Sequence, residues 1–144
     1  MKNYDLSQYM LREDNLILFP LTYEEIMILI DGKDKFQEYI RLPYFAKDQN
    51  KEELLSIASG VDMNDDYWFL KTQWVAVDVK ERAIIARLNL KQEDIFNKII
   101  YQINDEKCLS VKRDDVVNLF YKFLNVNNYV NIISFDVDGR KNEN

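Results

Sequence analysis

The chain has 144 residues, of which 47% are hydrophobic and 13% aromatic, enough to build the core of one domain without disulfides or metal. Its net charge of −6 disfavours nucleic acid and anionic lipid as partners, and the absence of histidine removes Ser-His, Cys-His and His-metal sites. Because only one cysteine is present and no apolar stretch has the length of a membrane span, we expect a soluble cytoplasmic protein with no membrane partner and no metal.

The first half of the chain predicts one strand followed by helices. The apolar run Leu16–Phe19 ends at Pro20, and Thr22 with Glu25 forms a capping box that opens a helix. Helices are expected at about 23–30, 34–42, 52–59 and 62–70.

The second half predicts a sheet with a helical crossover. Residues 73–78, 83–90 and 96–103 are rich in strand formers, and the polar turn 79–82 separates the first two, so three successive antiparallel strands are expected. An apolar helical stripe at 114–124 is followed by a β-branched strand at 129–135, which implies one parallel pairing. We expect a single domain spanning residues 1–144, of which residues 138–144 form a loose polar tail.

Three stretches, together with the order of elements, resemble the GNAT (Gcn5-related) superfamily of N-acetyltransferases. Leu18–Thr22 is similar to the family's opening strand and turn, 74–88 to its second and third strands, and 99–106 to its fourth strand and the entry to its cofactor loop. The resemblance covers about residues 15–136. It implies an α/β (α+β) fold with a mixed, mostly antiparallel sheet flanked by helices.

The resemblance also locates the loop that holds the pyrophosphate of acetyl-CoA in the family, which has the form Q/R-x-x-G-x-G/A. The candidate cofactor-binding residues are Ile103, Cys108, Leu109, Ser110, Val111, Lys112 and Arg113. Leu109 and Val111 occupy positions where relatives carry glycine, and their side chains fill the space through which phosphate approaches the backbone. The loop is therefore expected to be disabled, with no cofactor bound.

The catalytic groups implied by the resemblance are also replaced. Lys98 stands where many relatives have a glutamate as general base, and Tyr101 and Gln102 are the weak catalytic candidates nearby. The chain ends shortly after residues 129–135, so it is expected to lack the family's C-terminal helix and last two strands. It is interpreted as a degenerate, C-terminally truncated member.

Several residues admit two interpretations. The aromatic residues Trp68, Phe69 and Trp74 line an acyl groove or belong to the core, and the core is favoured. The aromatic residues Tyr39, Tyr44 and Phe45 hold an acceptor substrate or pack, and packing is favoured. Two further features are interpreted as structural: Asp136 and Asp138 end a strand rather than bind a metal, and Cys108 lacks a histidine to activate it.

Three functional hypotheses follow. The first is a GNAT-like domain without acetyltransferase activity that acts as a binding or protein-interaction module through the inherited groove or the exposed sheet. Its partner, a second copy or another protein, would pair with the sheet edge Tyr129–Phe135, which has no proline or lysine to block pairing. The second is an active acyl-CoA-dependent N-acetyltransferase with a non-standard cofactor loop, for which acetyl-CoA would be the cofactor. The third is an unrelated small regulatory protein with a similar strand order.

Overall fold

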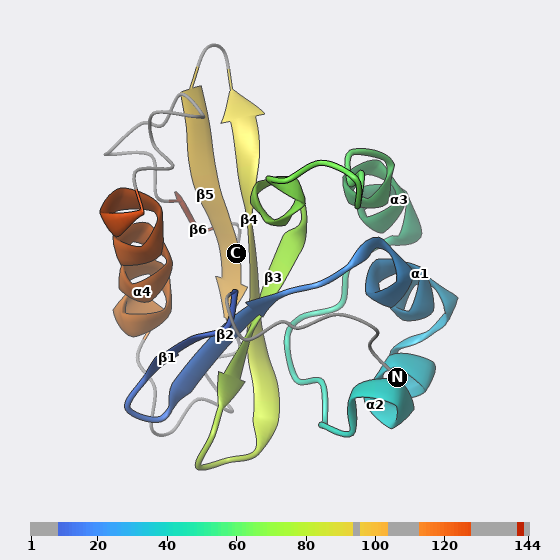
Figure 1. Ribbon diagram of the computed structural model, residues 1–144. Helices are drawn as coiled ribbons and strands as arrows, with labels where there is room; N and C mark the ends of the chain where they lie inside the picture. Colours follow the sequence, from blue (N-terminus) through green and yellow to red (C-terminus); the bar gives the residue numbers. More distant parts are fainter. Residues whose placement is uncertain (1–8, 94–95, 104–112, 128–140, 143–144) are drawn as a thin grey trace.

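The protein is a twisted sheet with helices on both faces. The computed structural model describes residues 9–93, 96–103, 113–127 and 141–142. Its strands are β1 (Leu11–Glu13), β2 (Leu16–Pro20), β3 (Gln73–Asp78), β4 (Ala83–Glu93), β5 (Phe96–Ile103) and β6 (Lys141–Asn142). Its helices are α1 (Tyr23–Asp31), α2 (Lys33–Ile40), α3 (Lys51–Ser59), the 3-10 helix η1 (Trp68–Leu70) and α4 (Arg113–Val126). Figure 1 shows α1, α2 and α3 on one face and α4 on the other.

The strands follow one another across a single sheet in chain order, from β1 to β6. Each neighbouring pair from β1 to β5 is antiparallel, whereas β6 runs parallel to β5 through Ile100–Lys141. A bulge between Ala76 and Val77 shifts the register of β3 against β4. This order confirms the expected mixed, mostly antiparallel sheet flanked by helices.

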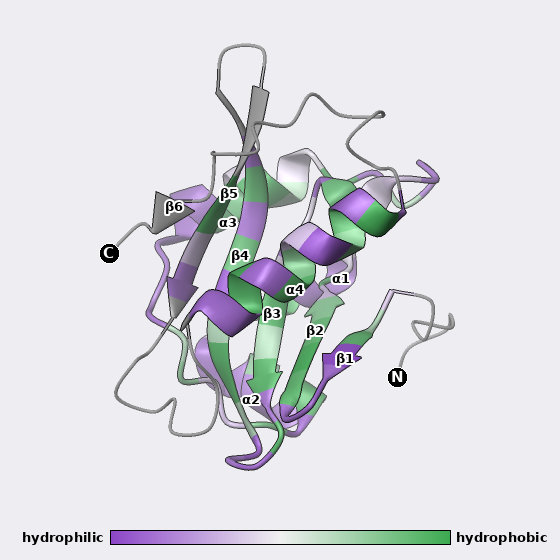
Figure 2. Ribbon diagram, turned by 90° about the vertical axis from the view of Figure 1, so that its left-hand side faces the viewer, coloured by the Kyte–Doolittle hydropathy of each residue, from purple (hydrophilic) through white to green (hydrophobic). Residues whose placement is uncertain are grey.

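The face covered by α4 is built around Trp74. The ring of Trp74 lies 5.1 Å from that of Phe120 and 5.4 Å from that of Phe123, and its indole N–H donates to the carbonyl of Phe69 at 2.7 Å. The predicted stripe of α4 is buried, as expected: Val116, Val117, Phe120, Phe123 and Leu124. Figure 2 shows α4 in front of the sheet, with hydrophobic and hydrophilic residues alternating along it.

The opposite face is covered by α1, α2 and α3, which bury Ile26, Phe36 and Leu54. The predicted capping box is present at the start of α1. The backbone N–H of Glu25 donates to Oγ1 of Thr22 at 3.2 Å, and the N–H of Thr22 donates to Oε1 of Glu25 at 3.0 Å. Such a cap contributes about 1 kcal/mol to stability.

The helix predicted at 62–70 is wrong except for its last three residues, which form η1. The side chains of two aspartates explain the difference. Oδ1 of Asp62 accepts from the N–H of Asn64, and Oδ1 of Asp65 accepts from the N–H of Tyr67, each at 2.9 Å. These local bonds offer the backbone an alternative to helix.

Two other parts of the chain differ from the sequence-based predictions. A short edge strand, β1, precedes the first predicted strand, and β6 forms within the segment 138–144 that was expected to be a loose tail. The strand and partner edge predicted at Tyr129–Phe135 lie outside the described residues. Among the described helices, none has the length and apolar character needed to cross a membrane.

Candidate functional site

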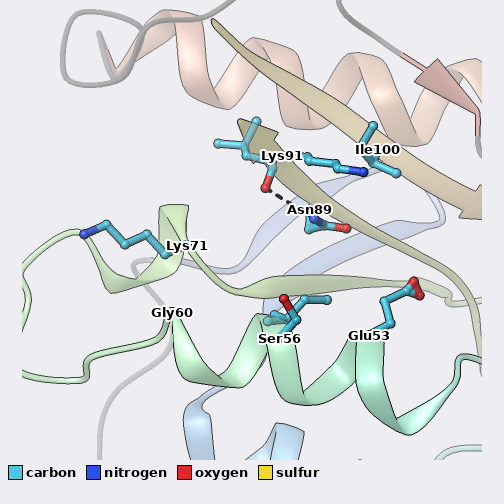
Figure 3. Close-up of a pocket in the computed structure, with 9 residues that line it drawn as sticks. Glu53, Ser56, Gly60, Lys71, Asn89, Lys91 and Ile100 are labelled. Carbon is cyan, nitrogen blue, oxygen red and sulfur yellow. Dashed lines mark hydrogen bonds between the residues drawn. The ribbon is translucent and has the colours of Figure 1, made fainter. Parts of the chain in front are cut away.

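A polar cleft of about 600 Å³ separates α3 from strands β4 and β5. We call it the α3 cleft, and its lining residues are Glu53, Ser56, Ile57, Gly60, Lys71, Asn89, Leu90, Lys91 and Ile100. Figure 3 shows Glu53 and Ser56 on α3 along one wall, with Asn89, Lys91 and Ile100 on the strands opposite. The cleft thus places a carboxylate and an ammonium group on facing walls.

The side chains of Asn89, Lys91 and Ile100 face α3 because side chains alternate along a strand. Gln73 pairs with Asn89, which in turn pairs with Ile100. Two residues farther along, Arg87 pairs with Gln102. These residues therefore share the face that α3 covers, and Tyr101, between Ile100 and Gln102, points to the opposite face.

A buried polar layer lies under α3. Nε2 of Gln49, in the segment before α3, donates to Oε1 of the fully buried Gln73 at 2.7 Å. The guanidinium of Arg87, 7% exposed, donates from Nε to the carbonyl of Lys47 at 3.4 Å. Its Nη1 lies 3.9 Å from Oε1 of Glu53. Arg87 therefore links the layer to the carboxylate of the cleft.

Four buried polar atoms near this layer have no hydrogen-bond partner within the described part of the chain. They are Nε2 of Gln73, Oε1 of Gln49, Oε1 of Gln102 and the hydroxyl of Tyr44. Buried polar atoms are nearly always paired, by protein, ligand or water. The layer therefore has unused capacity to donate and accept hydrogen bonds.

Tyr44 lines a second, smaller cavity of about 200 Å³ together with Asp48 and Gln49. Burial raises the pKa of its phenol to about 12, an effect that the nearby Arg87 partly opposes. The hydroxyl therefore stays protonated at neutral pH and can donate a hydrogen bond.

Comparisons with known proteins find likeness in fold. No family model matches the chain, and no curated protein matches its sequence. A ribosomal-protein-S5-alanine acetyltransferase from Vibrio fischeri superposes with a TM-score of 0.44 at 14% identity, covering 83% of this chain and 69% of that protein. A GNAT-family acetyltransferase from Bacillus anthracis does so with a TM-score of 0.42 at 9% identity, covering 80% of this chain and 65% of that protein. The likeness concerns the arrangement of the elements, not the substrates of these proteins.

The structure separates the two predicted catalytic candidates. Gln102 is buried on the α3 side beside Arg87, whereas Tyr101 lies partly buried against the core on the other face. Both were named as weak candidates because they lie near the position of the family's general base, but adjacent residues of a strand point to opposite faces.

The predicted cofactor-binding residues are mostly outside the described part of the chain. Ile103 is the last residue of β5 and Arg113 the first of α4; the remaining ones, 108–112, lie outside the described residues. The ambiguous aromatics are settled in favour of packing for Trp68, Phe69 and Trp74, all of which are buried. Tyr44 is also buried, but it contributes its hydroxyl to the smaller cavity.

The sequence-based predictions missed Glu53, Arg87, Asn89 and Lys91. A signal existed for Arg87, because it is the one charged residue in the otherwise apolar run 83–88. Glu53 carries no such signal, since a glutamate in the first turn of a helix is ordinary. No cluster of three or more cysteine or acidic side chains that would hold a metal occurs among the described residues.

Proposed function

We propose that this chain is a GNAT-like domain that binds a small zwitterionic ligand in the α3 cleft and does not transfer an acyl group. The proposal has two parts, the recognition of a ligand that carries both charges and the lack of proton-transfer chemistry. Each part has its own test.

The charges of the α3 cleft support the first part. Glu53 on α3 presents a carboxylate to one wall, and Lys91 on β4 presents an ammonium group to the other. Ser56 and Asn89 add neutral donors and acceptors between them. A ligand with an ammonium group near Glu53 and a carboxylate near Lys91 matches this pattern, as in a free amino acid or a dipeptide.

The strand positions that face α3 support the second part, and this observation carries the proposal. They include Asn89, Arg87 and Lys91 on β4 and Ile100 and Gln102 on β5. None of these side chains is a carboxylate or an imidazole, the groups that most often deprotonate an amine. The carboxylate that lines the cleft belongs to Glu53, and it forms an ion pair with Arg87.

Calorimetric titration with alanine and with alanyl-alanine tests the first part. Saturable binding is expected, and the variants Glu53→Gln and Lys91→Gln should each weaken it about tenfold, the size of one charge-assisted hydrogen bond. The matched control is Lys122→Gln, which removes an exposed ammonium group of α4 that pairs with Glu13 at 3.6 Å. The proposal fails if neither compound binds or if all three variants bind as the wild type does.

A further inference from the structure

An apolar groove, distinct from both the α3 cleft and the smaller cavity at Tyr44, shares no lining residue with the α3 cleft. We call it the hairpin groove, because it lies where the end of α2 meets the β3–β4 hairpin; Figure 1 shows these two features at the same end of the molecule. Its volume is about 690 Å³, within the range of small-molecule sites. Ile17, Phe19 and Val77 form its floor, and Leu42, Pro43 and Met10 extend its walls.

The floor offers no hydrogen bonds to a ligand. Ile17 and Phe19 belong to β2, which is paired on one side with β1 and on the other with β3. Val77 belongs to β3, which is paired with β2 and β4. Because both edges of these strands are used, a peptide backbone laid across them would lose its hydrogen bonds to water without replacement. A hydrocarbon chain has no such requirement, so the floor favours one.

The rim of the groove carries two exposed arginines, Arg41 and Arg82. Neither guanidinium has an ion pair or hydrogen bond within the described residues. Both residues also adopt left-handed backbone conformations, with φ of 65° and 52°, in which glycine or asparagine meets less strain. Arginine therefore stands at two positions whose left-handed backbone conformation favours glycine or asparagine.

The charge of the rim contrasts with that of the whole chain. The formal net charge of the protein is −6, yet two guanidinium groups at the groove outnumber its single carboxylate, Glu81. An anionic head group held at Arg41 and Arg82 would leave its apolar tail over Ile17, Phe19 and Val77. We infer that the hairpin groove binds a free aliphatic carboxylate of medium to long chain.

Affinity for a series of carboxylates tests this inference, independently of the α3 cleft. Octanoate, decanoate and dodecanoate are titrated below the concentrations at which they form micelles. Each buried methylene is expected to tighten binding about fourfold. Dodecanol and dodecyltrimethylammonium should bind at least tenfold more weakly than dodecanoate. Equal binding of all three compounds would mean an unselective apolar patch and would overturn the inference.

The variant Arg41→Asn/Arg82→Asn separates recognition from folding. Asparagine tolerates the left-handed conformation, so the melting temperature should not fall, while the affinity for dodecanoate should fall tenfold or more. Lys122→Gln, on the opposite face of the sheet, should bind dodecanoate as the wild type does. Unchanged affinity in the double variant would contradict the inference.

Two other occupants of the groove would also contradict it, and each has its own signature. If a second copy of the chain occupied the groove, sedimentation would show a dimer, and the double arginine variant would be a monomer. Dodecanoate would then not bind. If the chain's own residues 1–8 occupied the groove, dodecanoate would bind only to a variant from which these residues had been deleted.

Discussion

Gln49 and Gln73 are joined by a hydrogen bond of 2.7 Å, from Nε2 of the first to Oε1 of the second. Gln73 opens β3 and is fully buried, whereas Gln49 immediately precedes Asn50, the N-cap residue of α3. The bond therefore ties the start of α3 to the sheet. Because α3 forms one wall of the α3 cleft and the sheet forms the other, the pair helps to set the width of the cleft.

A double-mutant cycle on this pair should show coupling. Gln49→Ala and Gln73→Ala each remove one partner, and together they should destabilise the protein by about 1 kcal/mol less than the sum of the two single changes. Urea unfolding of the four proteins gives this number. Strict additivity would mean that the two side chains do not interact in solution.

The order of two substitutions at Arg87 tests its place in the polar layer. Arg87→Met removes the charge and keeps most of the packing volume, whereas Arg87→Lys leaves an ammonium group at a site only 7% exposed. We expect the lysine variant to be less stable than the methionine variant by about 1 kcal/mol or more, because an imperfectly paired buried charge costs more than an apolar side chain. A more stable lysine variant in urea unfolding would show that the site is wetter than the structure indicates.

The alkaline stability of the protein should depend on Tyr44. Burial raises the pKa of this phenol to about 12 from an ordinary value of 10.0. The unfolded chain therefore releases this proton before the folded one, and stability present below pH 10 is lost as the pH rises towards 12. The loss from this group amounts to about 2–3 kcal/mol.

The variant Tyr44→Phe measures this contribution. At pH 7 its stability should match or exceed that of the wild type by up to about 1 kcal/mol, because the hydroxyl has no partner among the described residues. Between pH 10 and 12 the variant should lose less stability than the wild type. Tyr23→Phe, which removes an exposed phenol, is the control and should follow the wild type. Parallel curves for all three proteins would contradict the assignment.

Introducing glycine at the positions that resemble the family's cofactor loop should not produce acetyl transfer. The variant Leu109→Gly/Val111→Gly removes the two side chains expected to keep phosphate from the backbone. The strand positions facing α3 would still offer no proton acceptor near neutral pH, so no acetylation of amines should be detectable with acetyl-CoA. Turnover by this variant would show that only the loop had decayed.

Local patterns predicted the elements well where one physical signal dominated. The capping box of Thr22 and Glu25 predicted the start of α1, and the apolar spacing of 114–124 predicted the buried face of α4. The segment 62–70 was misassigned because its apolar residues have helical spacing, while Asp62 and Asp65 satisfy the backbone locally. Periodicity does not report that competition.

The candidate site was harder to predict because residues far apart in the sequence build it. Glu53 comes from α3, Asn89 and Lys91 from β4 and Ile100 from β5. Strand alternation together with the register of β4 against β5 places Asn89 and Ile100 on one face, but nothing local in the sequence shows that α3 covers this face. The hairpin groove is likewise assembled from β2, β3 and the turns that follow α2 and β3.

The most direct test of the central claim is calorimetric titration of the wild-type protein with acetyl-CoA. No saturable binding is expected at concentrations up to about 1 mM; a Kd of that size corresponds to a binding free energy of only about −4 kcal/mol. Alanyl-alanine titrated under the same conditions should bind, and acetyl-CoA should not compete with it. Micromolar affinity for acetyl-CoA would contradict the claim and would instead favour an acyltransferase with a non-standard cofactor loop.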